Sequence, residues 1–256
     1  MTLLSARNIG VVRGHTTLLA DVSVDFGASE AVAVIGPNGS GKSTLLKVLA
    51  GIEAPSSGEV RLNDHVPARL SGAARAKLIG YLPQQFQPHW DLSVSELVRL
   101  GAERTGPAAE SKIERAIAEF ELTPFRRRRW STLSGGERAR TLLATVLSID
   151  PPLLLADEPA ASLDIRHRIE VSRALARRGK VKLSIVVMHD LELAFQLFDR
   201  IVLMNEGRIV ADGPTSEVVH DERLDDVFGV RFARVQRDGA ACLQVASVKQ
   251  DSRSVN

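Results

Sequence analysis

A glycine-rich stretch of nine residues constrains the fold of this chain more than any other feature. It follows an apolar run at residues 31–35, precedes a helical pattern at residues 45–50, and fits the phosphate-loop spacing G-x-x-x-x-G-K-[ST]. Its members are Gly36, Pro37, Asn38, Gly39, Ser40, Gly41, Lys42, Ser43 and Thr44. Glycines let successive N–H groups point at phosphate oxygens, and the following helix presents its free N-terminal donors to the same anion. The stretch therefore predicts a nucleotide site, in which Lys42 reaches the β- and γ-phosphates and Ser43 coordinates Mg²⁺.

Two adjacent acids at the end of another apolar run complete the predicted site. Asp157 and Glu158 directly follow residues 152–156. Because ligands of doubly wound folds gather at the carboxyl ends of the strands, Asp157 is placed to hold Mg²⁺, directly or through water. Glu158 is then positioned to polarise the attacking water. Two acids after a strand are by themselves often a solvated turn, and the phosphate loop is what favours the functional interpretation.

Short apolar runs alternate with helical patterns, which predicts an α/β fold with a largely parallel sheet. The clearest expected strands lie at residues 31–35, 78–82, 153–156, 184–188 and 200–204. Two earlier runs, at residues 3–12 and 18–26, alternate without a helix between them and favour an antiparallel pair. Between the expected strands at residues 78–82 and 153–156 the pattern is only helical, so a helical insertion in the core is expected. Its expected helices lie at residues 93–100, 108–121 and 136–148, and further possible strands lie near residues 231–235 and 243–248.

Composition excludes several classes of protein. The chain has 256 residues, 44% of them hydrophobic, and a formal net charge of +2, which are values for an ordinary globular protein and not for a disordered or disulfide-rich one. The strongest apolar runs stop far short of the roughly 18 residues that a membrane span needs, and no secretory leader is expected. A single cysteine, Cys242, fits a reducing cytosol. The near balance of charges does not favour a nucleic-acid partner.

A third motif, Leu133-Ser134-Gly135-Gly136-Glu137, precedes the last helical pattern of the insertion. Read locally, Ser134 and Glu137 form a capping box, and the glycine pair leaves helix N-terminal amides uncovered for an anion. At this point the chain resembles the ATP-binding subunits of ABC transporters, over about residues 3–219. The remaining motifs of that family follow in order: Gln84 after Tyr81-Leu82-Pro83, the segment Ser162-Leu163-Asp164, and His189 after Ile185-Val186-Val187-Met188.

The resemblance implies a P-loop ATPase core with an N-terminal antiparallel β subdomain and an inserted α-helical subdomain. The ATPase domain would cover residues 1–220, with the insert at about 86–150, and residues 221–256 would form an extension and tail. Gln84 would sense Mg²⁺ and the water, and His189 would contact the γ-phosphate of ATP. Ser134, Gly135, Gly136, Glu137 and Asp164 would complete the nucleotide site of a second copy, so that a homodimer encloses two ATP molecules.

The family resemblance also implies a place in the cell. Such a subunit lies peripherally on the cytoplasmic face of the inner membrane, held there only by permease subunits, and a periplasmic substrate-binding protein is expected in the same system. For docking to the permease the chain offers Phe86, Pro88, Trp90 and Leu92, although the two aromatic residues could instead cover the core of the insert.

The chain departs from the family pattern at several positions. Arg13 stands where an aromatic residue usually stacks on adenine; a guanidinium can also stack on a flat ring, so we expect Arg13 to contact the base. Glu137 replaces the commoner glutamine and adds a negative charge at a helix N-terminus. Ala160 and Ala161 replace the usual threonine and serine, a change expected to have little effect.

Weaker features bear on the cargo. Residues 163–168, 93–101 and 227–230 resemble segments of importers for ferric siderophores, haem and cobalamin, which favours a metal-chelate importer. The alternatives are another ABC importer, an exporter, or a soluble ABC ATPase that acts on nucleic acid, for which Arg126-Arg127-Arg128-Arg129-Trp130 is the best support. A nucleotide-binding clamp without turnover is disfavoured because Glu158 and His189 are both present.

Overall fold

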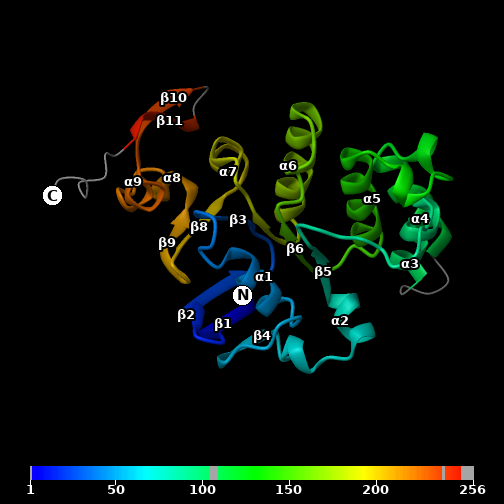
Figure 1. Ribbon diagram of the computed structural model, residues 1–256, viewed down its shortest axis with the longest axis horizontal. Helices are drawn as coiled ribbons and strands as arrows, with labels where there is room; N and C mark the ends of the chain where they lie inside the picture. Colours follow the sequence, from blue (N-terminus) through cyan, green and yellow to red (C-terminus); the bar gives the residue numbers. More distant parts are fainter. Residues whose placement is uncertain (1, 104–108, 238–239, 249–256) are drawn as a thin grey trace.

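A six-stranded sheet forms the centre of the computed structural model, which describes residues 2–103, 109–237 and 240–248 (Figure 1). The strand order is β5-β6-β7-β3-β8-β9, and all neighbours are parallel except β8 and β9. The strands are β3 (Ala31–Ile35), β5 (Ile79–Leu82), β6 (Leu153–Asp157), β7 (Leu183–Val187), β8 (Arg200–Asn205) and β9 (Arg208–Pro214). The five strands expected from the apolar runs are present to within about a residue, and β9 is an additional edge strand.

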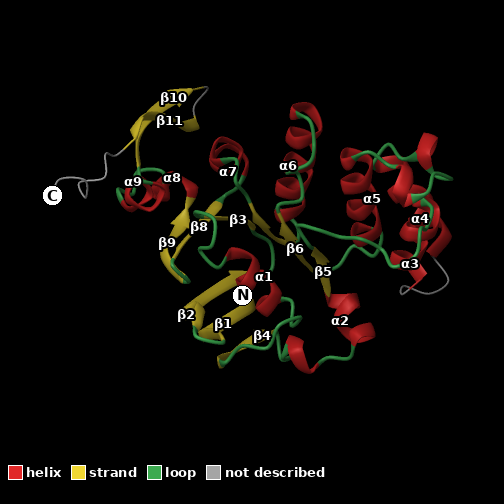
Figure 2. Cartoon of the chain, viewed as in Figure 1, coloured by secondary structure: helices red, strands yellow, loops and turns green. Residues whose placement is uncertain are grey.

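Both faces of this sheet are covered, which explains why its strands are continuous apolar runs. Along β3, Val32 and Val34 enter one hydrophobic core, whereas Ala31, Ala33 and Ile35 enter the other. The first core lies against α1 (Lys42–Leu49), and the second lies against α6 (Ile165–Gly179) and α7 (Leu191–Leu197) (Figure 2). The sheet is therefore the middle layer of the molecule, and its strand ends define where the site can lie.

The expected N-terminal antiparallel pair is present and carries a third strand. The sheet has the order β2-β1-β4, from β1 (Thr2–Arg13), β2 (Thr16–Gly27) and β4 (Ser57–Leu62). Only Val60 and Leu62 of β4 are buried, so its pattern is too short to stand out in the sequence. This sheet packs over α1 and closes the first core, in the lower part of Figure 1.

The chain between β5 and β6 is helical, as expected, and has a hydrophobic core of its own. It contains α3 (Val94–Ala102), α4 (Ala109–Glu119) and α5 (Gly135–Leu147), with short 3₁₀ turns at Thr123–Phe125 and Trp130–Thr132. Capping boxes begin both α3, at Ser93 and Glu96, and α5, at Ser134 and Glu137. The three helices gather beyond the β5 edge of the sheet (Figure 2). A 3₁₀ turn at Pro67–Arg69 and helix α2 (Gly72–Leu78) precede β5.

The chain after β9 packs onto the core, as far as the structure describes it up to residue 248. Helices α8 (Thr215–Val218) and α9 (Arg223–Phe228) lead to a hairpin of β10 (Val230–Arg237) and β11 (Ala240–Val248). Phe232 and Leu243 of this hairpin are buried in the second core. The two possible strands near residues 231–235 and 243–248 thus pair with each other. Among the described residues, no helix combines the length and the apolar character that crossing a bilayer demands.

Candidate active site

The glycine-rich loop joins β3 to α1 and is shaped by backbone contacts that only glycine permits. Gly36 has φ 148°, and a Cβ there would lie 2.2 Å from the carbonyl oxygen of Met204. Gly41 has φ 100°, and a Cβ there would lie 2.8 Å from the carbonyl oxygen of Leu18. Both positions are in the region of φ that disfavours other residues. The loop is thus held between β8 and β2.

Lys42 is buried in this loop and reaches back over it. Its Nζ donates hydrogen bonds of 2.8 Å to the carbonyl oxygens of Gly36 and Pro37. Burial lowers the pKa of Lys42 below its ordinary value, while the negative charges of Glu158 and Asp157 act in the opposite direction. An incoming phosphate would bring a negative charge into direct contact with the Lys42 ammonium group.

A cavity of about 550 Å³ opens at the loop and reaches three other strand ends. Its lining comprises Leu18, residues 38–44 of the loop, Gln84, Glu158 and His189. Gln84, Glu158 and His189 follow β5, β6 and β7, which are neighbours in the sheet. Their side chains therefore converge, although Gln84 and His189 are 105 positions apart in the sequence. Gln84, Glu158 and His189, which were predicted separately, therefore share one site with the loop.

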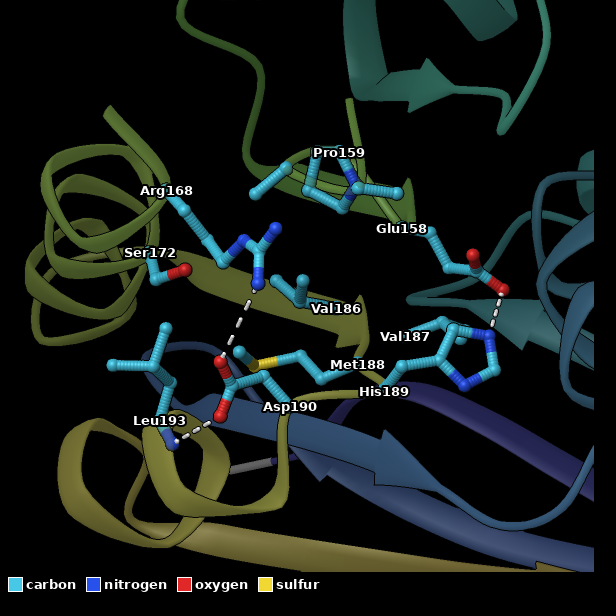
Figure 3. A pocket seen from close by; sticks show the side chains of 12 residues that line it. Glu158, Pro159, Arg168, Ser172, Val186, Val187, Met188, His189, Asp190 and Leu193 are labelled. Carbon is cyan, nitrogen blue, oxygen red and sulfur yellow. Dashed lines mark hydrogen bonds and ion pairs between the residues drawn. The ribbon is translucent and has the colours of Figure 1, made fainter. Parts of the chain in front are cut away.

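Glu158 is the centre of this group. Its Oε2 accepts a hydrogen bond of 2.8 Å from Gln84 Nε2, and its Oε1 lies 2.5 Å from His189 Nε2. Figure 3 shows the contact with His189 at the edge of a neighbouring cavity. The backbone of Glu158 is left-handed, with φ 51°, a conformation that costs a non-glycine residue about 1–2 kcal/mol. The strained turn at the end of β6 orients the carboxylate between its two partners.

Asp157, one residue earlier, is 2% exposed and has an oxygen, Oδ1, without a hydrogen-bond partner in the described structure. Burial raises its pKa, and a hydrogen bond from Ser43 lowers it to a smaller extent. A buried carboxylate beside a hydroxyl is a donor set that suits Mg²⁺, which commonly keeps several waters and takes its other ligands from phosphate. No group of three or more His, Cys, Asp or Glu side chains in the described residues could hold a metal. The protein ligands that fit Mg²⁺ here are therefore the Asp157 carboxylate and the Ser43 hydroxyl.

The predicted Ser134–Glu137 motif forms the N-terminus of α5, outside the lining of the phosphate-loop cavity. Ser134 Oγ accepts a 3.3 Å hydrogen bond from the Glu137 amide, and Glu137 Oε2 accepts a 2.8 Å bond from the Ser134 amide. The expected capping box is thus confirmed. Gly135 and Gly136 form the first helical turn, and a Cβ on Gly135 would lie 3.5 Å from Ser162 Cβ. One chain therefore carries two separate candidate anion sites.

Two further predicted residues, Asp164 and Arg13, are absent from the lining of the phosphate-loop cavity. Asp164 caps α6, accepting a 3.0 Å hydrogen bond from the His167 amide, and its Oδ2 lies 2.7 Å from His167 Nδ1. Arg13 lies at the end of β1, 67% exposed, with its guanidinium 2.7 Å from Glu53 Oε1. Neither residue lines the phosphate-loop cavity.

Three residues near the site were not singled out from the sequence. Leu18, on β2, lines the cavity beside the loop, and nothing in its local pattern indicates this. Asp190 caps α7 directly after His189, and an acid before an apolar run is a recognisable helix start. Arg168, on α6, lies 4.0 Å from Asp190, a contact that depends on the tertiary fold.

Residues 19–161, more than half of the chain, match the family model described as ABC transporter. The chain belongs to the ABC transporter family. It is an ABC ATPase, an ATP-binding enzyme that couples ATP hydrolysis to transport, and the predicted family and fold class are confirmed.

Curated relatives of this ABC ATPase agree with the assignment. The hemin import ATP-binding protein HmuV of Bradyrhizobium diazoefficiens is 38% identical over 247 residues, which cover 93% of this chain and 92% of the relative. The protein of the same name from Thermobifida fusca is 39% identical, with 88% and 82% of the two chains covered.

Solved structures share the fold of this ABC ATPase. A dimeric ATP-binding cassette in a post-hydrolysis state, bound to ADP and Pi, is 26% identical with a TM-score of 0.76; 83% of this chain and 98% of that chain are covered. An ABC transporter in an inward-facing conformation has a TM-score of 0.81 at 22% identity, with 98% and 99% of the chains covered. The second likeness concerns the fold alone.

Proposed function

We propose that this ABC ATPase powers the import of a metal chelate, with haem as the favoured cargo. The observation that carries the hydrolytic part is the position of Glu158 between Gln84 and His189, beside the phosphate loop. The cargo rests on the relatives named for hemin import, which match nearly the full length of the chain. Ferric siderophores and cobalamin remain the other candidates from the sequence, and another ABC importer or an exporter is the alternative.

In the proposed mechanism, the phosphates of ATP enter the loop and Lys42 exchanges its two carbonyl contacts for phosphate oxygens. Ser43 and Asp157 would hold Mg²⁺, with Gln84 nearby, and the ion would supply positive charge against the phosphates. Glu158 polarises the attacking water. Each carboxylate oxygen has more than one acceptor position, so Glu158 can bind a water while Gln84 and His189 fix its orientation. His189 would also contact the γ-phosphate.

We further propose that two copies form the working unit. The Ser134–Glu137 motif and Asp164 lie outside the cavity of their own chain, so each would serve the nucleotide of the partner. The similar cassette that is dimeric with ADP and Pi supports this arrangement. Arg13 stays in the proposal as a contact to the base, which would require its guanidinium to leave Glu53.

The proposed unit lies on the cytoplasmic face of the inner membrane, attached to permease subunits, and takes its cargo from a periplasmic binding protein. The surface we propose for the permease is the groove between the α/β core and the helical segment. A cavity of about 650 Å³ there is lined in part by Ile52, Tyr81, Phe86 and Leu100. Phe86 also packs edge-on against the buried Trp130, at 5.6 Å between ring centroids, so it partly covers the core of the insert. Trp90 is 70% exposed and offers its ring to a partner.

Replacing Trp90 by alanine is expected to weaken binding to the permease by about 30-fold, because aromatic anchors contribute about 2 kcal/mol or more at interfaces. The measurement is the affinity of the purified variant for permease in detergent or nanodiscs. Val181→Ala, at a position 74% exposed before β7, is the control and should bind normally. An unchanged affinity of the Trp90 variant would place the interface elsewhere.

The cargo is tested in the source organism by deleting the gene and supplying iron as hemin, as a ferric siderophore, or as a simple iron salt. We expect loss of growth on hemin alone, restored by the wild-type gene and not by Glu158→Gln. Loss on the siderophore instead would assign a different chelate. Normal growth of the deletion strain on every source, with normal uptake of labelled hemin and siderophore, would contradict chelate import.

No observation favours the nucleic-acid alternative as a second candidate. Arg126 lies 2.5 Å from Glu114, and Arg129 lies 3.3 Å from Glu96. Arg128 lies 3.6 Å from Glu137. The basic run is thus interleaved with carboxylates, which is the arrangement of a solvated protein face.

A further inference from the structure

A second cavity, of about 250 Å³, is lined in part by Glu158 and His189 (Figure 3). Its walls come from the chain after β6, from α6, from the end of β7, and from the start of α7, and most of its lining is apolar. Besides Glu158 and His189, three polar residues line it: Arg168, Ser172 and Asp190. None of them has a role in the proposed mechanism, yet they lie next to the residues that do.

Arg168 joins two segments that belong to different parts of the site. Its Nη2 donates a 3.3 Å hydrogen bond to the carbonyl oxygen of Leu163, inside the segment 162–164. Its Nη1 lies 4.0 Å from Asp190 Oδ2. Its Nε is buried and has no partner in the described structure. A planar guanidinium presents its donors in a rigid fork that suits two acceptors, whereas an ammonium group is a point charge on a flexible stem.

Asp190 connects this contact to the catalytic group. It directly follows His189, and its other oxygen, Oδ1, accepts a 3.0 Å hydrogen bond from the amide of Leu193. This bond fixes the first turn of α7. His189 is therefore held between a cap on one side and its contact with Glu158 on the other, and Arg168 acts on the cap (Figure 3).

We propose that Arg168 is a positioning residue, which makes the orientation of His189 depend on the position of residues 162–164. The inference rests on the proposed function, in which that segment faces a second copy. A shift of the Leu163 carbonyl moves the guanidinium relative to Asp190, and the adjacent cavity provides space that a close-packed interior would not. The distance between Arg168 and Asp190, now 4.0 Å, can therefore shorten. The Nε of Arg168, which has no partner in the described structure, can likewise move to an acceptor.

Steady-state kinetics of three variants test this inference. Arg168→Ala should lower kcat about tenfold, equivalent to about 1.4 kcal/mol of transition-state stabilisation, with KM for ATP within about twofold of wild type. Asp190→Asn keeps a good helix cap but removes the charge, so it should lower kcat similarly. Because the two residues act as one unit, the double variant should be no slower than the slower single variant. Arg168→Lys keeps the positive charge but not the planar group, so its kcat should lie between the values of Arg168→Ala and wild type.

Arg173→Ala, an exposed position on the same helix, is the matched control and should behave as wild type. A wild-type kcat in Arg168→Ala, or losses that multiply in the double variant, would overturn the inference. If Arg168→Ala does not fold, Asp190→Asn and Arg168→Lys still test the inference, because each should lower kcat while KM for ATP stays within about twofold of wild type. Glu158→Gln is measured in parallel: hydrolysis retained there contradicts the proposed role of Glu158 as the base, whereas its loss beside an unaffected Arg168→Ala contradicts only this inference.

Discussion

Replacing Glu158 by glutamine should lower ATP hydrolysis by about two to four orders of magnitude, because a positioned general base contributes a factor of that size. Glutamine has nearly the same shape and can keep one contact with the neighbouring side chains, but it cannot accept the proton of the water. ATP binding should remain, since the loop and Lys42 are unchanged. The measurements are phosphate release and equilibrium binding of ATP.

The same variant should accumulate a stable dimer when ATP is added, which size-exclusion chromatography detects. Glu206→Gln is a matched control, because Glu206 also has a left-handed backbone, with φ 46°, but is exposed in the turn between β8 and β9. It should hydrolyse ATP at the normal rate. Full activity of the Glu158 variant would remove this residue from the role of base.

Replacing Lys42 by alanine should act one step earlier, on nucleotide binding. Hydrogen bonds to charged groups contribute about 1.5–3 kcal/mol, so the loss of this phosphate contact should raise the Kd for ATP by roughly 10- to 150-fold. Because Nζ is held by the Gly36 and Pro37 carbonyls, its removal also leaves these oxygens without that donor. Isothermal titration with ATP and Mg²⁺ measures the effect.

Lys77→Ala is the control for this variant, because Lys77 is an exposed lysine on α2. It should bind ATP with normal affinity. The affinity of the Lys42 variant for adenosine alone should also be normal, since no phosphate is present in that ligand. Unchanged ATP affinity after loss of Lys42 would show that the backbone amides of the loop are sufficient.

The parts of this fold that could be predicted are those with strong local patterns. The glycines at 36, 39 and 41 require backbone conformations that few residues adopt, so they indicate a phosphate loop without any knowledge of the rest. The central strands are buried on both faces and are therefore continuous apolar runs. Ser134 and Glu137 form their capping box within one helical turn, so local sequence is sufficient there too.

The parts that could not be predicted depend on tertiary contacts. Strand β4 buries only two side chains, and helix α6 is rich in arginine on its exposed side, so neither has a distinct apolar pattern. The direct contacts of Glu158 with Gln84 and His189 join residues 74 and 31 positions apart. Arg13 was aligned by family pattern, and its pairing with Glu53, 40 positions away, has no local signal.

The strand order has a consequence for how such a protein can diversify. The helical segment departs from β5 and returns at β6, and these two strands are hydrogen-bonded neighbours about 4.8 Å apart. Insertions, deletions or exchange of α3 and α4 would leave both attachment points in register, and with them Gln84, Asp157 and Glu158, as long as the Ser134–Glu137 motif at the start of α5 is kept. The residues proposed for hydrolysis and the helices proposed to contact the permease can thus change independently.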